Sequence, residues 1–305
     1  MQFSNLLTLQ GQLFLLLTVG AIARRLQLFD KRAKQLLTDL VLYIALPCSI
    51  IRSFQIQVSG DLFSSLLTVF FVSVAIQGVS WIFSKVFYRS TDPYKAKVLR
   101  YAILISNAGF IGIPIAGQMF GPVGYMYASV YLIPQRVMMW SAGLAIFNSA
   151  HLSKKEAAKN VLLQPCMVAV YVGLFLLVSG LHLPRFVENT LDSLGGATTA
   201  LSMLLIGSLF AEMDRDQLVL DKNLFSFSII RLFLIPFITL IGCHFAGIDP
   251  MVASVSIILS GMPGGSSTVI LASKYGGDTI YASKLVIIST AFSLISISLW
   301  ALALQ

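Results

Sequence analysis

Long stretches without a single charged residue dominate the chain. They cover residues 1–23, 62–84, 101–135, 160–184, 193–211, 232–248, 250–273 and 285–305. Several of these stretches exceed the ~20 residues that a helix needs to cross ~30 Å of hydrocarbon. The pattern therefore predicts an all-α integral membrane protein that crosses the bilayer many times.

Ten membrane-spanning helices account for the whole pattern. We expect them at residues 5–23, 36–54, 62–87, 96–120, 122–148, 160–181, 187–211, 223–246, 250–274 and 280–304. The polar connections between them are too short to form a soluble domain. Residues 1–305 are therefore expected to form a single transmembrane domain.

Composition and charge agree with a membrane protein. Hydrophobic residues make up 57% of the chain and charged residues only 11%, whereas a typical soluble domain has about 25% charged residues. The net charge of +8 therefore does not indicate a nucleic-acid partner. In a protein surrounded by lipid, it reflects how Lys and Arg are divided between the two sides of the bilayer.

The basic residues divide very unequally. If the ten helices alternate in direction, 17 of the 21 Lys and Arg residues lie on one side and only Arg52 and Arg185 on the other, with Arg136 and Arg231 inside helices. Cytoplasmic loops collect Lys and Arg. We therefore expect a multi-pass protein of the cytoplasmic membrane with both termini on the extracytoplasmic side.

The sequence resembles itself after a shift of 154 positions. The matching positions are Ser106 with Ser260, Tyr127-Ala128-Ser129 with Tyr281-Ala282-Ser283, and Leu9-Gln10 with Leu163-Gln164. The shift places the first five predicted helices on the last five. Because five is an odd number, the second set enters the membrane from the opposite face. We therefore predict two inverted five-helix repeats, residues 1–150 and 155–305.

Two predicted helices, the fourth and the ninth, contain sequences that suit a continuous helix poorly. They are "SNAGFIGIPIAGQMFG" at 106–121 and "SGMPGGSSTVILASKYGG" at 260–277, and Gly and Pro are unfavourable inside helices. Interrupted helices at corresponding positions of inverted repeats indicate the binding site of a secondary transporter. Close packing and kinks are the competing explanation. We expect helices 4 and 9 to be broken and to cross near the bilayer midplane.

Broken helices present N-terminal ends to the middle of the membrane. Such an end carries about half a positive charge and several free N–H groups, which suit a carboxylate. Ser266, Ser267 and Thr268 follow Pro263-Gly264-Gly265 and are suited to cap the second half of helix 9, while Asn107 is placed to donate from helix 4. These features favour a small organic anion as the solute.

Two arginines lie within predicted helices. Arg136 sits in the middle of its helix, where a charge costs about 2.5–3.5 kcal/mol on insertion scales. It is therefore expected either to face the anion or to form a salt bridge or backbone contacts that stabilise the bundle. Arg231 lies nearer the cytoplasmic end of its helix, and we expect its long side chain to reach the interface.

Catalytic and metal-binding patterns are missing from the sequence. No Asp or Glu lies in the middle of a predicted helix, and no HExxH motif or nucleophile–base pair is present. Cys48, Cys166 and Cys243 are interpreted as packing residues. We therefore expect no enzyme and no cofactor. The alternatives are a membrane-embedded sensor or an enzyme without transport, and the coupling ion, sodium or proton, stays open.

Three motifs resemble the auxin efflux carrier family in its bacterial form. They are "LPCSIIRSF" at Leu46–Phe54, "NAGFIGIP" at Asn107–Pro114 and "MPGGSSTVILASKY" at Met262–Tyr275, similar to the family's second, fourth and ninth helices. The resemblance extends over essentially the whole chain. It implies a transporter of mono- or dicarboxylates or auxin-like acids that works by alternating access. A sodium-coupled symporter of the related bile-acid-carrier type is the alternative.

The resemblance also implies a division of labour between the helices. Helices 1, 2, 6 and 7 would form a scaffold and the contact of a homodimer, and helices 3–5 and 8–10 would form the transport unit. The family's Asn in helix 4 and Gln in helix 5 correspond to Asn107 and Gln135. Plant members have Asn-Pro where this chain has Gln164-Pro165, so the role of that Asn does not carry over.

The candidate solute-binding residues combine the half-helix argument with the resemblance. They are Asn107, Gly109, Gly112, Pro114, Gln135, Arg136, Pro263, Gly264, Gly265, Ser266, Ser267 and Thr268.

Overall fold

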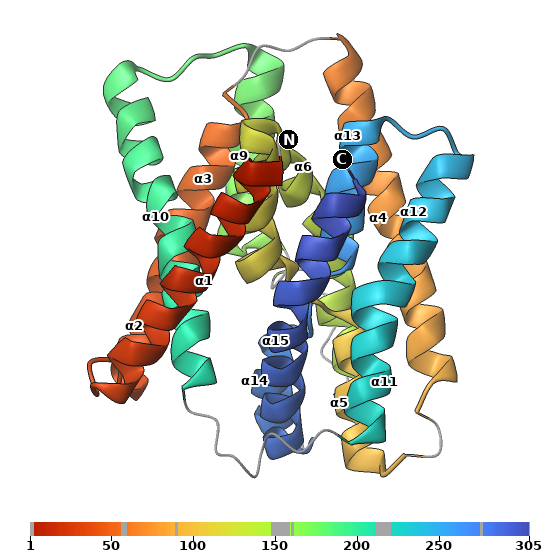
Figure 1. Ribbon diagram of the computed structural model, residues 1–305. Coiled ribbons are helices and arrows are strands. Elements are labelled where there is room, and N and C mark those ends of the chain that lie inside the picture. The colour runs from red at the N-terminus through yellow and green to blue at the C-terminus, as the bar shows by residue number, and fades with distance from the viewer. Residues whose placement is uncertain are drawn as a thin grey trace.

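All regular secondary structure in the described part of the chain is helical. This computed structural model describes residues 3–55, 60–88, 91–147, 159, 162–211, 221–274 and 277–304. The only extended pairing among them is an isolated antiparallel bridge between Ser106 and Gly264. The described helices fall into two groups that pack side by side (Figure 1).

The first group consists of helices from the N-terminal segment and from the middle of the chain. In chain order they are α1 (Phe3–Arg25), α2 (Lys31–Leu40), the π-helical turn η1 (Val41–Ala45), α3 (Leu46–Ser53), α9 (Pro165–Ser179) and α10 (Arg185–Phe210). Helix α10 packs along α1, α2, η1 and α3, and α9 packs on α3. This group forms the left half of Figure 1.

The second group contains the remaining helices. From the first half of the chain they are α4 (Gly60–Val86), α5 (Pro93–Leu104), η2 (Ala108–Gly112), α6 (Ile113–Met138), η3 (Met139–Gly143) and α7 (Leu144–Phe147). From the second half they are α11 (Lys222–Ile229), η5 (Ile230–Leu234), α12 (Ile235–Phe245), α13 (Pro250–Ser260), α14 (Ser267–Lys274) and α15 (Thr279–Ala303). Helix α6, through α3 and α9, and helix α15, through α1, join this group to the first.

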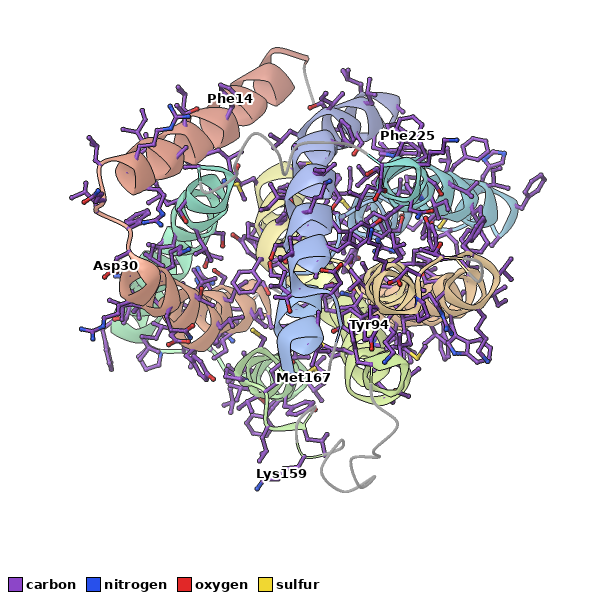
Figure 2. The ribbon with its side chains drawn as sticks, turned by 90° about the horizontal axis from the view of Figure 1, so that it is seen from below. Phe14, Asp30, Tyr94, Lys159, Met167 and Phe225 are labelled. Carbon is purple, nitrogen blue, oxygen red and sulfur yellow. The ribbon has the colours of Figure 1, made fainter. Side chains whose placement is uncertain are left out.

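Several helices have the length and apolar character of membrane spans. Within the described residues these are Arg32–Ser53, Leu62–Val86, Lys222–Phe245 and Thr279–Ala303, with a fifth if Ala108–Met138 and Ser141–Phe147, bent by 44°, count as one. Large apolar side chains such as Phe14 and Phe225 point outward from both groups (Figure 2). The protein is thus an all-helical membrane protein, as predicted. Ten crossings in two inverted repeats stay a prediction.

Three π-helical turns share one cause. A proline is the second residue after each of η1, η2 and η5. These prolines are Pro47, Pro114 and Pro236. Proline has no backbone N–H and its ring crowds the preceding turn, and a wider π turn accommodates this because its hydrogen bonds reach one residue further back. The prolines therefore set the register of these helices, including the turn that holds Arg231.

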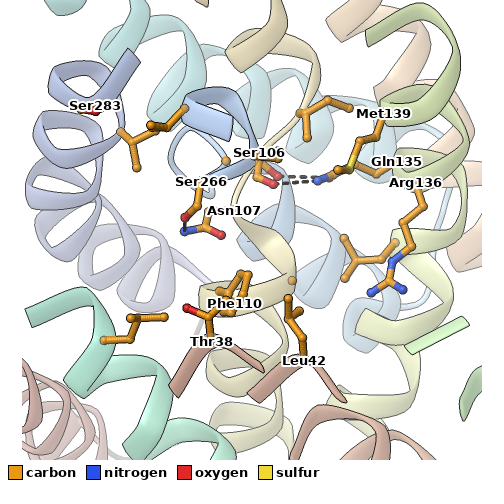
Figure 3. A pocket seen from close by; sticks show the side chains of 18 of the residues that line it. Thr38, Leu42, Ser106, Asn107, Phe110, Gln135, Arg136, Met139, Ser266 and Ser283 are labelled. Atoms are coloured by element: carbon orange, nitrogen blue, oxygen red, sulfur yellow. Dashed lines mark hydrogen bonds between the residues drawn. The ribbon is translucent and has the colours of Figure 1, made fainter. Parts of the chain in front are cut away.

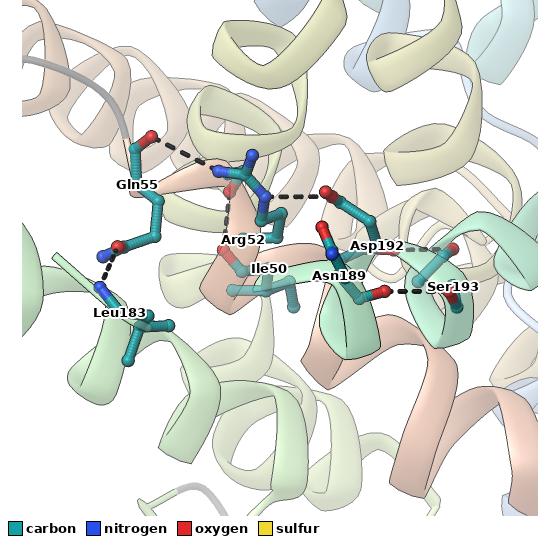
Figure 4. A network of polar contacts seen from close by, with 10 residues as sticks. Ile50, Arg52, Gln55, Leu183, Asn189, Asp192 and Ser193 are labelled. Carbon is teal, nitrogen blue, oxygen red and sulfur yellow. Dashed lines mark hydrogen bonds and ion pairs between the residues drawn. The ribbon is translucent and has the colours of Figure 1, made fainter. Parts of the chain in front are cut away.

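Polar contacts join α3 to α10 at one end of the first group (Figure 4). The guanidinium of Arg52 contacts the carboxylate of Asp192 at 2.9 Å, and the buried Ser49 hydroxyl donates to the Gly195 carbonyl at 2.9 Å. Both residues of α3 point at successive turns of α10. The pair is thereby fixed in register as well as in distance.

Helices α1 and α10 approach each other through two glycines. A Cβ atom at Gly20 would overlap the backbone carbonyl of Leu204, and one at Gly207 would overlap the carbonyl of Leu17. The contact is reciprocal, since each helix places a glycine against the backbone of the other. Small residues at such positions let membrane helices pack with their backbones in close approach.

This contact gives a prediction for stability. Gly20→Ala should lower the free energy of unfolding by about 1–3 kcal/mol, because the added methyl group meets backbone that cannot move aside. The matched control is Gly11→Ala in the same helix, where nothing lies within 4 Å of the added Cβ. Thermal unfolding of the purified protein in detergent measures both. Equal melting temperatures for the two variants would contradict the packing described.

Candidate functional site

Two interruptions of helical structure meet at the centre of the second group. One separates α5 from η2 at residues 105–107, and the other separates α13 from α14 at residues 261–266. The backbone N–H of Asn107 donates to the Pro263 carbonyl at 2.8 Å, and the N–H of Gly265 donates to the Ile105 carbonyl at 3.1 Å. We call this pairing the crossing. Each break leaves backbone N–H and C=O groups without partners in their own helix, and some of these groups form hydrogen bonds with the other break.

Glycines allow the two segments to come this close. A Cβ atom at Gly264 would lie 2.7 Å from the Leu285 side chain, and one at Gly112 would lie 2.6 Å from the side chain of Leu259. The N–H of Gly264 also donates to the buried Ser289 hydroxyl at 3.2 Å. These glycines pack the crossing against α13 and α15.

A cavity of about 710 Å³ lies beside the crossing (Figure 3). Seven of the twelve candidate residues line it: Asn107, Gly109, Gln135, Arg136, Gly265, Ser266 and Ser267. The other five, Gly112, Pro114, Pro263, Gly264 and Thr268, do not line it and are buried within the packing around the crossing. The structure thus divides the candidates into residues that line the cavity and residues that pack around the crossing.

Side chains from both interrupted helices meet at the cavity wall. The Asn107 amide donates to the Ser266 hydroxyl at 3.3 Å, and the Tyr101 hydroxyl donates to the Ser267 hydroxyl at 3.0 Å. In Figure 3, Asn107 and Ser266 point toward each other. Asn107 is 5% exposed, so its amide has little contact with solvent and its position is fixed by the bond to Ser266.

Gln135 holds the backbone next to Asn107. Its amide nitrogen donates to the Ser106 carbonyl at 2.8 Å, and its amide oxygen accepts from the Ser106 hydroxyl at 3.1 Å. Such a two-bond contact fixes Ser106 in distance and orientation. Gln135 thus supports the first break from α6, in addition to lining the cavity.

Arg136 brings a positive charge to the cavity wall. Its Nη1 atom is shielded from solvent and has no hydrogen-bond partner among the described residues. Of the two roles expected from the sequence, the structural one would require a salt bridge or backbone contacts, and none is seen in the described part of the chain. Figure 3 shows the side chain extending from α6 beside the lining residues. A buried donor without a partner is costly, so a ligand that accepts from it would be stabilised.

The expected position of Arg231 was wrong. Its side chain does not reach the interface: it is 1% exposed and lies beneath the crossing. Its Nε donates to the Met262 carbonyl at 3.0 Å and its Nη1 to the Ile103 carbonyl at 3.2 Å. A single Arg in an apolar stretch gives no sign of such acceptors, because they are backbone groups that only the fold brings together.

The sequence did not identify the side of the cavity that the first group contributes. Lys34, Gln35 and Thr38 of α2 line it, as does Gln164 immediately before α9. Lys34 and Thr38 are four residues apart, which places them on one face of a helix. The spacing was readable, but nothing in the sequence shows that this face covers the crossing. The Gln164 side-chain oxygen is buried without a hydrogen-bond partner among the described residues.

Comparison with known proteins identifies the family. The sequence profile of the family described as "Membrane transport protein" matches residues 9–159 and 149–301, nearly the whole chain. This chain belongs to the auxin efflux carrier family. The membership expected from the three motifs is thereby confirmed, and the protein is a membrane transport protein.

Two archaeal relatives match this family member over almost their full length. An uncharacterized transporter of Methanocaldococcus jannaschii is 24% identical over 299 residues, covering 94% of each chain. An uncharacterized transporter of Methanothermobacter thermautotrophicus is 26% identical over 302 residues, covering 95% of each chain. Both names are those of transporters.

In this chain, the described residues contain no cluster of His, Cys, Asp or Glu suited to a metal ion.

The contact between Gln135 and Ser106 gives a second prediction. Gln135→Leu removes both hydrogen bonds and leaves the buried Ser106 groups unpaired, which should cost about 1–3 kcal/mol of stability. The matched control is Gln118→Leu, also in α6, because the Gln118 side-chain oxygen is buried without a hydrogen-bond partner among the described residues. Thermal unfolding should show a loss for Gln135→Leu alone. If Gln118→Leu destabilises as much, Gln135 has no special role at the crossing.

Proposed function

We propose that this auxin efflux carrier family member is a secondary transporter that carries a small organic anion across the cytoplasmic membrane by alternating access, with the anion held beside the crossing. The observation that carries this proposal is the charge of the cavity. Arg136 lies on its wall, and the described residues that line it include no Asp or Glu. An anion entering this cavity would meet the Arg136 guanidinium, whose Nη1 atom has no hydrogen-bond partner among the described residues.

Helix ends add to this attraction. Gly109 and Phe110 lie in the first turn after the first break, Ser267 begins α14, and all three line the cavity. The N–H groups of a first helical turn have no acceptor within the helix, and the N-terminal end is positive. Together with the Asn107 amide and the Ser266 hydroxyl, they form donors suited to a carboxylate. The apolar remainder of the lining, such as Leu42 and Val286, suits the carbon skeleton of the solute.

The cavity lies toward one end of the molecule. Lys34 and Gln35 at the start of α2 and Thr279 at the start of α15 line it, and all three follow loops that the distribution of basic residues assigns to the cytoplasm. We infer that this conformation is open to the cytoplasm. Toward the other end, α3 packs against α6 and separates the cavity from the outer face. Transport would require the two groups of helices to move relative to each other.

The architecture supports the ten-helix plan with inverted repeats. Both interrupted helices begin with the same cap: Asp92 accepts from the N–H groups of Tyr94 and Lys95 and precedes Pro93, while Asp249 accepts from those of Met251 and Val252 and precedes Pro250. The caps are 249 − 92 = 157 residues apart, close to the 154-residue shift. In this proposal, residues 1–150 and 155–305 are the repeats.

The two packed groups fit the division expected from the family resemblance. The first group corresponds to the scaffold of helices 1, 2, 6 and 7, which would form the homodimer, and the second to the transport unit of helices 3–5 and 8–10. Both chain ends lie on the same side in Figure 1, as an even number of crossings requires. The site set remains the twelve residues given above, with the seven lining residues in direct reach of the anion.

Counterflow in proteoliposomes tests transport directly. The full chain should exchange radiolabelled acetate, malonate, malate or indole-3-acetate, and the same assay with an imposed sodium or proton gradient separates a uniporter from a symporter. Asn107→Ala should lower the flux about tenfold or more, the scale of one or two lost polar contacts. Pro263→Ala should also lower it, because the residue that disfavours helix at the second break is removed. Both variants should keep their folded yield. Asn189→Ala, at an exposed position of α10, is the control. Ligand binding without counterflow would indicate a sensor, and substrate turnover an enzyme.

Arg136 allows a separate test of the anion. Arg136→Gln should raise the apparent KM for the carboxylate about tenfold, because one charge-assisted hydrogen bond is lost, while Arg136→Lys should have a smaller effect. The comparison of transported carboxylates with neutral amides of the same shape measures the loss of selectivity. If Arg136→Gln transports with unchanged KM and selectivity, the arginine is structural and the anion is held elsewhere.

A further inference from the structure

The buried guanidinium of Arg231 lies where two helices end. Ile103 is in the last turn of α5, and Met262 follows the end of α13. In an uninterrupted helix, the N–H of Asn107 would donate to the Ile103 carbonyl; here it donates to the Pro263 carbonyl instead. The Ile103 carbonyl is thus released by the break, and Arg231 donates to it.

The charge of Arg231 matches its surroundings. Each helix C-terminus carries about half a negative charge, so the ends of α5 and α13 together offset about one positive charge. No Asp or Glu among the described residues forms an ion pair with Arg231. The counter-charge of this arginine is therefore backbone from the two interrupted helices.

The arginine is held firmly from its own side. Arg231 is the second residue of the π turn η5, and Pro236 sets the register of that turn. The Trp300 indole donates to the carbonyl of the next residue, Leu232, at 2.8 Å. These two supports are suited to a group that fixes the position of others.

We propose that Arg231 is a positioning residue that binds the two negative helix ends of the crossing and so leaves the two positive ends to face the anion. Without this charge, the negative ends would lie unscreened in a dry interior next to the site and would repel a carboxylate. This role rests on the proposed function of the cavity as an anion site. It differs from the role of Arg136, because Arg231 does not line the cavity.

Cross-linking measures the crossing without any substrate. In the full chain with Cys48, Cys166 and Cys243 replaced by Ala, Asn107→Cys and Ser266→Cys are joined by a short bifunctional thiol reagent. Arg231→Gln, which keeps a donor but loses the charge, should lower the cross-linked fraction at least about threefold, whereas Arg231→Lys should keep it near the wild-type level, because one charge-assisted hydrogen bond can be retained. Arg52→Gln, which breaks an ion pair remote from the crossing, is the control.

The transport assay separates a positioning role from a purely structural one. For whichever of the four carboxylates the wild type exchanges, Arg231→Gln should raise KM about tenfold, the scale of a lost charge-assisted contact, and Arg231→Lys less than half as much. Unchanged cross-linking and KM in Arg231→Gln would overturn the proposal. If Arg231→Gln does not fold, Arg231→Lys is the deciding variant. A lowered cross-linked fraction together with a raised KM in Arg231→Lys would overturn the proposal, because this variant keeps the positive charge. If no carboxylate is exchanged, the proposed function fails, while cross-linking still tests whether Arg231 holds the crossing.

Discussion

Pairing between the backbones of two interrupted helices is the constraint on which the rest of this structure depends. A membrane interior offers no water to hydrogen-bond a broken helix, and each unsatisfied N–H or C=O group costs several kcal/mol. Here the break before η2 and the break before α14 face each other, and the bonds from Asn107 to Pro263 and from Gly265 to Ile105 satisfy part of what both release. Neither break would be stable alone, so each interrupted helix requires the other.

The crossing also separates the negative ends of the interrupted helices from their positive ends. Four half-helix ends converge within a small volume, and the two negative ends share Arg231 on the buried side. The two positive ends border the cavity, where Arg136 lies and where the described lining residues include no Asp or Glu. The desolvation cost of a buried arginine is large, and it is offset here by two charge-assisted hydrogen bonds. In the proposed function, the same backbone that builds the fold therefore also provides the attraction for an anion.

The sequence predicted much of this, and its failures have a physical pattern. The all-helical membrane fold and the family followed from uncharged stretches and from three motifs, and the lining positions of Asn107 and Ser266 followed from glycine and proline at matching places. Gly112 and Gly264, two of the candidate residues, do not line the cavity but pack closely against Leu259 and Leu285, and the sequence alone does not show which side of a glycine faces a cavity. Arg231 was misplaced because its acceptors come from distant segments, and Lys34 was missed because only the fold brings α2 to the cavity.

An experimental density map of the full chain in lipid nanodiscs with a transported carboxylate would test the crossing and the proposed anion site together. We expect interrupted helices at residues 105–107 and 261–266, with ligand density against Asn107 and Ser266 on the side of the crossing away from Arg231. Continuous helices through these segments, or a carboxylate bound against Arg231 or outside the cavity, would contradict this expectation.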